Sequence, residues 1–289
     1  MSRVTARRKT LRISPKGVVR RPDTLAVEEP LEIRTGGRSL AVTMRTPGAD
    51  IDLIHGFLFS EGVITRAEDI AIARYCAGTD ANGQNTYNLL DVQLREPVEV
   101  KPRNFLTNSA CGLCGKTALD EVRTRIRYPI PTEGLTVETS VLSALPGELR
   151  SRQEVFDATG GLHAAGLFTA DGTALAVRED VGRHNAVDKV IGWALRENRV
   201  PAHDLVLMVS GRASFELVQK AAMAGIPVLG AVSAPSSLAV DLADETGLTL
   251  IGFLRGDSMN IYSGTHRVLM DSHGLENSDR NGHSPSRTV

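Results

Sequence analysis

The sequence predicts an α/β protein with two domains, a larger α/β domain preceded by a smaller N-terminal α+β domain. In the second half of the chain, apolar runs of strand length alternate with amphipathic segments of helix length. That order favours parallel strands joined by right-handed helical crossovers. The first half mixes strands and helices, and Pro129, Pro131 and Pro146 interrupt the pattern between the halves. We therefore expect domains over residues 25–140 and 141–270.

The N-terminal domain is expected to follow a flexible basic tail, or an edge strand, formed by residues 1–24. Short apolar runs on either side of Gly36-Gly37 predict a hairpin. Apolar residues recur at helical spacing over 50–60, and Gly62 is a suitable stop. The strands expected in this half cover residues 30–33, 39–44, 89–94 and 98–100, and a second helix covers 117–126.

The second domain is expected to open with a hairpin around Asp171-Gly172 and to continue with alternating helices and strands. The last stretch, residues 271–289, is rich in Ser, Asn, Gly and His, so we expect a disordered tail. The strands expected here cover 162–168, 174–177, 205–209, 227–232 and 248–254, and the helices cover 185–197, 215–224 and a segment that ends near 245.

Composition excludes several classes of protein. The chain has 289 residues and a formal net charge of -1, which gives no broad basic field for general nucleic-acid binding. No window approaches 18 uninterrupted apolar residues, so no membrane helix is expected, and no apolar stretch of a signal peptide follows the basic N-terminus. We expect a cytoplasmic protein. Only three cysteines occur, which argues against a disulfide framework.

Two of those cysteines, Cys111 and Cys114, form a CxxC pair flanked by glycines and followed by Lys116. The predicted helix begins just after the pair, so its N-terminal dipole and the lysine charge both favour a thiolate. A thiolate near neutral pH is a competent nucleophile. Cys111 and Cys114 are therefore the candidate catalytic residues.

Four interpretations of the pair compete. A structural zinc site needs about four ligands, and one CxxC supplies two. A thioredoxin-type redox pair normally opens a helix directly after a strand, whereas the segment before Cys111 is polar. A zinc deaminase needs H-x-E and P-C-x-x-C, and neither pattern occurs. The fourth interpretation is a persulfide carrier, and spacing alone does not separate it from redox exchange.

Three polar loops follow three consecutive predicted strands, at 210–212, 233–236 and 255–258. They are expected along one edge of the sheet, where open α/β sheets bind ligands. Arg212, Arg255 and the N-termini of the following helices suit phosphate oxygens. No Walker lysine motif and no G-x-G-x-x-G occurs. The loops thus predict an unusual anion site, although small polar residues also turn and cap chains in any α/β domain.

The ionisable run 178–185 ends a predicted strand and opens a helix, and His163 follows Gly160-Gly161. Helix capping and surface charge would explain the run, and a satisfied core histidine would explain His163. Either could instead shape the pocket or tune a thiol.

Taken together, several separated stretches resemble the FdhD family of formate dehydrogenase accessory sulfurtransferases. The resemblance covers roughly residues 28–267, and the stretches that carry it are Arg45-Thr46-Pro47-Gly48, His55-Gly56-Phe57-Leu58-Phe59-Ser60-Glu61-Gly62, Cys111-Gly112-Leu113-Cys114-Gly115-Lys116, Thr159-Gly160-Gly161-Leu162-His163, Glu179-Asp180-Val181-Gly182-Arg183-His184-Asn185 and Ser210-Gly211-Arg212.

The resemblance implies a fold and a function. It implies a cytidine-deaminase-like fold for the larger domain and a homodimer. Cys111, assisted by Cys114, would take sulfur as a persulfide from a cysteine desulfurase. The sulfur would pass to the bis(molybdopterin guanine dinucleotide) molybdenum cofactor before its insertion into the formate dehydrogenase apoenzyme. The cofactor would be transient cargo, with GDP as its mimic and no resident cofactor or metal.

The resemblance also implies where the cargo binds. Asp257 is a departure that places a negative charge near the expected phosphate site. The candidate cofactor-binding residues are Phe253, Leu254, Arg255, Gly256, Asp257, Ser258, Ser210, Gly211, Arg212 and His184.

Overall fold

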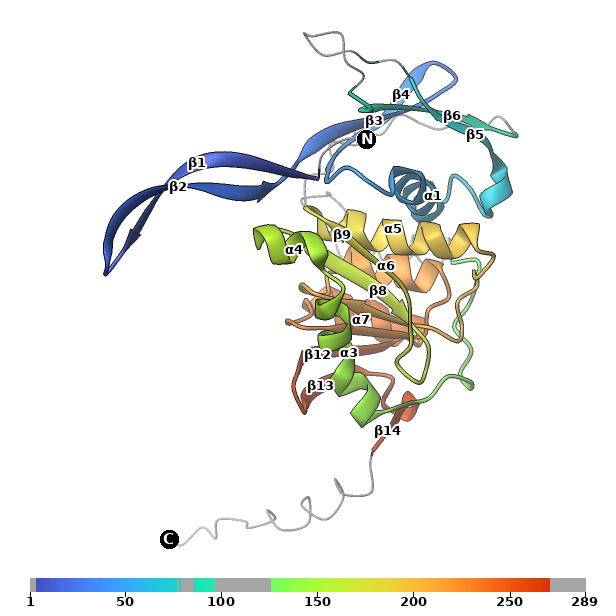
Figure 1. The fold of residues 1–289 in the computed structure, drawn as a ribbon. Helices are drawn as coiled ribbons and strands as arrows, with labels where there is room; N and C mark the ends of the chain where they lie inside the picture. The colour runs from blue at the N-terminus through green and yellow to red at the C-terminus, as the bar shows by residue number, and fades with distance from the viewer. Residues whose placement is uncertain (1–3, 77, 79–85, 97–125, 271–289) are drawn as a thin grey trace, which may run out of the picture.

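The computed structural model describes residues 4–76, 78, 86–96 and 126–270. Figure 1 shows a projecting hairpin, a small sheet with helix α1 beneath it, and a larger sheet with helices on both faces. The expected strand 98–100, most of the expected helix 117–126 and the expected tail 271–289 lie outside the described residues.

The first element is a hairpin of β1 (Thr5–Ser14) and β2 (Gly17–Ala26), which pair antiparallel over their full length. Of the two expectations for residues 1–24, a tail or an edge strand, the tail is wrong for the described part. The turn is closed by Gly17 at φ 116°, a conformation that favours glycine. We call residues 4–27 the arm, because the hairpin extends away from the rest of the molecule (Figure 1).

The small sheet has the strand order β4-β3-β6-β5, and its predicted strands at 30–33, 39–44 and 89–94 are confirmed. The predicted helix over 50–60 is confirmed as α1 (Asp50–Ser60). Gly62 follows it at φ 73°. The strands are β3 (Glu29–Thr35), β4 (Arg38–Arg45), β5 (Ile70–Tyr75), which the sequence did not predict, and β6 (Leu89–Leu94); a short 3-10 helix covers Ala67–Asp69.

The large sheet has the order β13-β12-β11-β10-β8-β9. β10, β11 and β12 are parallel, as predicted, and β8 and β9 form the predicted hairpin. Because β8 is antiparallel to both β10 and β9, β9 runs in the same direction as the parallel strands. The strands are β8 (His163–Phe168), β9 (Ala174–Asp180), β10 (Val206–Val209), β11 (Val228–Ala231), β12 (Thr249–Arg255) and β13 (Ser258–Ser263).

Helices cover both faces of this sheet. The three that the sequence predicted, α5 (Arg183–Arg196), α6 (Phe215–Met223) and α7 (Ser237–Thr246), share one hydrophobic cluster with the sheet. On the opposite face lies α3 (Thr139–Ser151), which the sequence did not predict. The remaining short elements are α4 (Glu154–Thr159), β7 (Val137–Glu138), β14 (Val268–Leu269) and a 3-10 helix over Thr265–Arg267.

One hydrophobic cluster extends through both predicted domains, from the small sheet across α1 and α5 to the large sheet. The two helices cross closely at Gly56 and Gly192, where an added Cβ would overlap the backbone of the other helix. The division at 140/141 stays a prediction, but the two halves share a core. Among the residues that the structure describes, no helix has the length and apolarity needed to cross a membrane.

Candidate functional site

β9, β10, β11 and β12 all end at one edge of the large sheet, and α5, α6 and α7 begin there. The three polar loops predicted to meet at this edge do so. The backbone N–H of Ser236 donates to Ala213 O at 3.1 Å, and that of Phe253 donates to Ser233 O at 3.3 Å. We call this region the carboxyl edge; it brings loops 210–214, 233–236 and 253–258 into direct contact.

Phe253 stands out at the carboxyl edge. It has φ 51°, which is costly for a bulky residue, and the residue is 40% exposed. A register shift between Gly252 and Arg255 turns the aromatic ring outward, while the neighbouring Leu254 is fully buried in the core. Arg255 is anchored through Nε to Val232 O at 3.2 Å. The edge therefore offers an aromatic face beside an anchored cation.

The predicted residues 255–258 form the turn from β12 into β13, so the sequence missed a strand after them. Gly256 adopts φ 52°, and Asp257 and Ser258 are exposed beside it. Leu254 differs from the other predicted contacts, because its buried side chain leaves only its backbone near the edge.

His184, on the first turn of α5, joins the N-terminus of α6. Its Nε2 lies 3.0 Å from Glu216 Oε2, and the Ser214 hydroxyl donates to the same carboxylate at 3.0 Å. The hydrogen bond from His184 is the largest cause that lowers the pKa of Glu216 to about 2. This cluster was not predicted as a unit, since His184 lies 30 residues before Ser214 in sequence.

His163 begins β8 and lies beside Gly211, where a Cβ would meet its Nδ1 at 3.3 Å. Burial lowers its pKa, and the charges of Arg183 and His184 lower it further, which favours a neutral ring. Ser210 is tied to the sheet, because its hydroxyl accepts from the Ala164 N–H at 2.9 Å. His163 is half-buried and borders the carboxyl edge, and the choice between its two interpretations stays a prediction.

A buried ion pair supports the start of α5. Lys189 Nζ lies 2.7 Å from Asp180 Oδ2, and both side chains are at most 2% exposed. Asp180 also accepts from the N–H groups of Thr46 at 3.1 Å and Gly182 at 2.8 Å, and from Asn185 Nδ2 at 3.1 Å. The pair therefore fixes loop 45–48 against the turn that carries Arg183 and His184.

Sequence reasoning missed Lys189. The available signal was a lysine whose neighbours at helical spacing include the apolar residues Ala186 and Trp193. A buried lysine needs a charge partner, and Asp180 was the nearest acidic residue before the predicted helix start.

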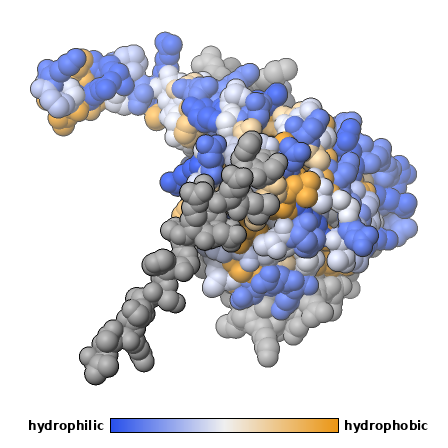
Figure 2. Space-filling view, turned by 90° about the horizontal axis from the view of Figure 1, so that it is seen from below, coloured by the Kyte–Doolittle hydropathy of each residue, from blue (hydrophilic) through white to orange (hydrophobic). Residues whose placement is uncertain are grey.

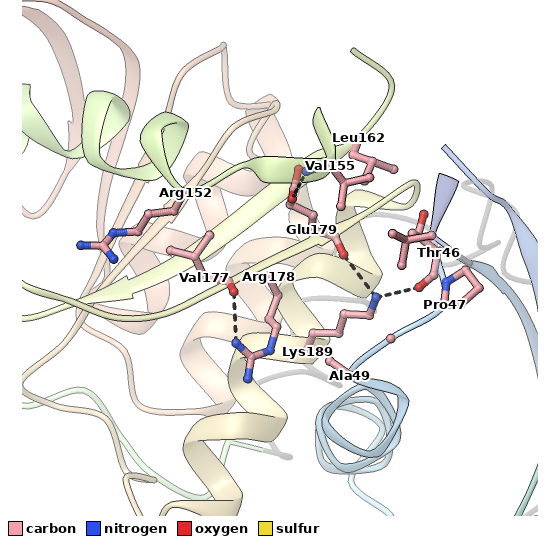
Figure 3. A pocket seen from close by; sticks show the side chains of 12 residues that line it. Thr46, Pro47, Ala49, Arg152, Val155, Leu162, Val177, Arg178, Glu179 and Lys189 are labelled. Carbon is pink, nitrogen blue, oxygen red and sulfur yellow. Dashed lines mark hydrogen bonds between the residues drawn. The ribbon is translucent and has the colours of Figure 1, made fainter. Parts of the chain in front are cut away.

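A cavity of about 180 Å³ opens next to this pair, between the base of the arm, α4 and β9 (Figure 3). Figure 3 shows Lys189 between Thr46 O and Glu179 O, which it reaches at 3.0 and 3.2 Å. Arg178 is paired with Asp52 at 2.9 Å. Lys189 and Arg178 both have acidic partners, so neither cation is free to hold an anionic ligand in the cavity. The cavity lies where the stretches 45–48, 159–163 and 179–185 meet. We therefore place the candidate site at the carboxyl edge.

Cys111 and Cys114 lie outside the described residues, so their geometry is not part of this site. Within the part of the chain that the structure describes, His, Cys, Asp and Glu side chains form no group of three that could hold a metal ion.

The fold and the carboxyl edge define a class: an α/β protein with a polar edge made by four strand ends and three helix N-termini. A family model described as FdhD/NarQ family matches residues 26–269. The chain belongs to the FdhD/NarQ family.

Individual relatives agree with the family model. The chain is 73% identical over 272 residues to the "Sulfur carrier protein FdhD" of Nocardia farcinica (strain IFM 10152), covering 94% of this chain and 98% of that protein. It is 55% identical to the protein of the same name from Mycobacterium tuberculosis (strain ATCC 25618 / H37Rv), covering 93% and 100%.

A solved structure is also similar. A putative formate dehydrogenase accessory protein from Desulfotalea psychrophila superposes with a TM-score of 0.73 at 25% identity, covering 92% of this chain and all of that one. This likeness supports the mixed α/β fold. The likeness of the larger domain to cytidine deaminases stays a prediction.

Proposed function

We propose that this protein is a sulfur carrier for formate dehydrogenase maturation. The observation that carries the proposal is the 73% identity, over nearly the whole chain, to a protein named as a sulfur carrier. The similar fold of a protein described as a putative formate dehydrogenase accessory protein supports formate dehydrogenase as the enzyme that is served. The CxxC pair supplies the chemistry, since a cysteine thiolate is a strong nucleophile.

In the proposed reaction, the thiolate of Cys111 attacks the terminal sulfur of a persulfide on a cysteine desulfurase. A new S–S bond forms on Cys111, the desulfurase thiolate leaves, and the chain now holds the sulfur. Cys114 assists this sulfurtransferase step. The Cys114 thiolate then attacks the inner sulfur, on Cys111, so that a Cys111–Cys114 disulfide forms and the outer sulfur leaves as sulfide. The sulfide passes to the bis(molybdopterin guanine dinucleotide) cofactor, which is the substrate, before the cofactor enters the formate dehydrogenase apoenzyme, and an external dithiol reduces the disulfide for the next round.

The carboxyl edge is the proposed binding site for the guanine nucleotide of the cofactor. The exposed ring of Phe253 suits stacking on a base, which is worth about 1–3 kcal/mol. Arg212 and Arg255 are exposed cations beside the N-termini of α6 and α7, which suit phosphate. Asp257 reduces the positive charge there, so its carboxylate is expected to face away from the phosphates. We further propose that the protein acts in the cytoplasm as a homodimer.

The experiment is an intact-mass measurement after incubation with a cysteine desulfurase and cysteine. We expect the wild type to gain one sulfur atom on Cys111 and the Cys111→Ala variant to gain none while still binding GDP. Cys76, a free cysteine in the described part of the chain, provides a matched control. The Cys76→Ala variant should accept sulfur as the wild type does.

Other outcomes would point elsewhere. Disulfide reduction that requires both Cys111 and Cys114, without sulfur gain, would favour a thiol–disulfide oxidoreductase. Full maturation of formate dehydrogenase by Cys111→Ala would favour a cofactor-binding chaperone. Tight zinc on the cysteine pair would favour a structural role.

A further inference from the structure

The arm exposes aliphatic side chains that belong to neither hydrophobic cluster of the described residues. Near its tip Leu11 is 56% exposed, Ile13 75%, Val18 60% and Val19 59%. A two-stranded hairpin is only marginally stable alone in water. Figure 2 shows hydrophobic and hydrophilic residues side by side on this projection, away from the body of the molecule. An arm of this kind needs a covering surface.

Both faces of the arm carry apolar residues. Ile13 lies opposite Val18, so these two side chains share one face. Val19 lies opposite Arg12, so it belongs to the other face. A flat lipid surface would cover one face at a time, whereas a protein groove covers both. The arm also lacks Trp, Tyr and Phe, which are the residues enriched at membrane interfaces.

The charge of the arm indicates the chemistry of its partner. Residues 4–27 hold seven basic side chains and one acidic one, and the rest of the chain holds 26 basic and 33 acidic side chains. The arm is therefore positive and the body negative. A second copy of the chain offers an acidic body to each arm, and reciprocal exchange closes a two-fold pair without leaving an arm uncovered.

We propose that the arm of one chain lies against the acidic body of a second copy. Leu11, Ile13 and Val18 on one face of the arm, and Val19 on the other, are buried in the contact. The inference rests on the homodimer proposed above and gives it a contact surface. The basic side chains of the arm steer and fix the contact, so the dimer should weaken as salt rises.

The experiment uses the full chain, mixed in equal parts from ¹⁴N- and ¹⁵N-labelled preparations. A carbodiimide joins lysine directly to carboxylate, and mass spectrometry finds the linked peptides. We expect links of mixed isotope between Lys9 or Lys16 and carboxylates of the body. Links found only between peptides that carry the same isotope would overturn the proposal. Links that join one arm to another arm would also overturn it.

Sedimentation equilibrium supplies the second measurement. Leu11→Ser, Ile13→Ser and Val18→Ser combined should raise the dimer dissociation constant roughly tenfold or more. The matched control combines Val42→Ser, Ile72→Ser and Leu269→Ser, which are 40%, 47% and 47% exposed on the body, and should change it little.

Charge reversal by Arg20→Glu and Arg21→Glu should also weaken the dimer, with circular dichroism unchanged because these residues lie outside the core. An unchanged dimer in the arm variants would refute the arm contact and leave the homodimer standing. A monomeric wild type would refute both. A monomer that binds anionic phosphatidylglycerol vesicles through the arm would assign the arm to membranes instead.

Discussion

Two ion pairs near the carboxyl edge differ in exposure and therefore in what they do. Lys189 and Asp180 are at most 2% exposed, so their charges are stable only because each has its partner and further hydrogen bonds. His184 and Glu216 have side chains 29% and 38% exposed. The buried pair fixes the backbone that carries the site, whereas the exposed pair lies where a ligand or solvent can reach it.

The partly exposed pair predicts a pH dependence. The folded pKa of Glu216 is about 2, below its ordinary value of 4.5. Its contribution to stability is therefore present above pH 4.5 and is lost as the pH falls toward 2. Glu216→Gln should lower the free energy of unfolding by about 1 kcal/mol at pH 7, allowing for solvent screening, and by less at pH 3.5.

Urea unfolding of wild type and variant at the two pH values would measure this difference. Glu245→Gln, at an exposed glutamate on α7, is the control and should cost little at either pH. An equal cost of Glu216→Gln at pH 7 and 3.5 would contradict the assigned pKa.

At the scale of elements, the crossing of α1 and α5 joins the two halves of the chain. Gly56 faces the backbone of Asp188, and Gly192 faces that of Asp52. Because an added methyl group would overlap a carbonyl oxygen, Gly56→Ala should push the helices apart and lower the free energy of unfolding by about 3 kcal/mol or more.

Gly147 in α3 makes a matched control for this prediction. A Cβ at Gly147 would meet nothing within 4 Å, so Gly147→Ala should raise stability by about 0.5–1 kcal/mol through helix propensity. Thermal and urea unfolding would compare the two variants. A Gly56→Ala protein as stable as the wild type would show that the helices do not meet as closely as the structure has them.

The elements that the sequence predicted are those in which apolar residues recur with a clear periodicity. α1, α5, α6 and the parallel strands combine regular apolar spacing with turn residues at their ends. α3 was missed because Pro146 lies inside it, and proline normally ends a helix. Leu142, Leu145 and Leu149 are buried against the large sheet, so tertiary packing outweighs that local preference. β13 was missed because the polar turn at Gly256 has the composition of a loop that ends a domain's last strand.

At the scale of the whole molecule, the carboxyl edge was predictable because topology alone decides where parallel strands end. The contacts that complete it were not. His184 meets Glu216 only once α5 and α6 are packed side by side, and Asp180 meets Thr46 across 134 residues. Pairings of this kind depend on three-dimensional packing and leave no spacing signal in a single sequence.

The edge as a whole predicts a nucleotide affinity that depends on its two arginines. Arg212 and Arg255 come from loops after different strands, and each is expected to donate charge-assisted hydrogen bonds to phosphate. Removing both, as Arg212→Ala with Arg255→Ala, should weaken GDP binding at least roughly tenfold, since each such bond is worth about 1.5–3 kcal/mol. The control removes Arg38 and Arg199, which are exposed outside the carboxyl edge.

Isothermal titration with GDP would measure both double variants at one salt concentration. The control changes the net charge by the same amount, so it separates the local contacts from a loss of general attraction. An equal loss of GDP affinity in both double variants would mean that GDP binding depends only on the overall charge of the protein. A loss confined to the first variant would place the phosphates between the loops after β10 and β12, within reach of the outward ring of Phe253.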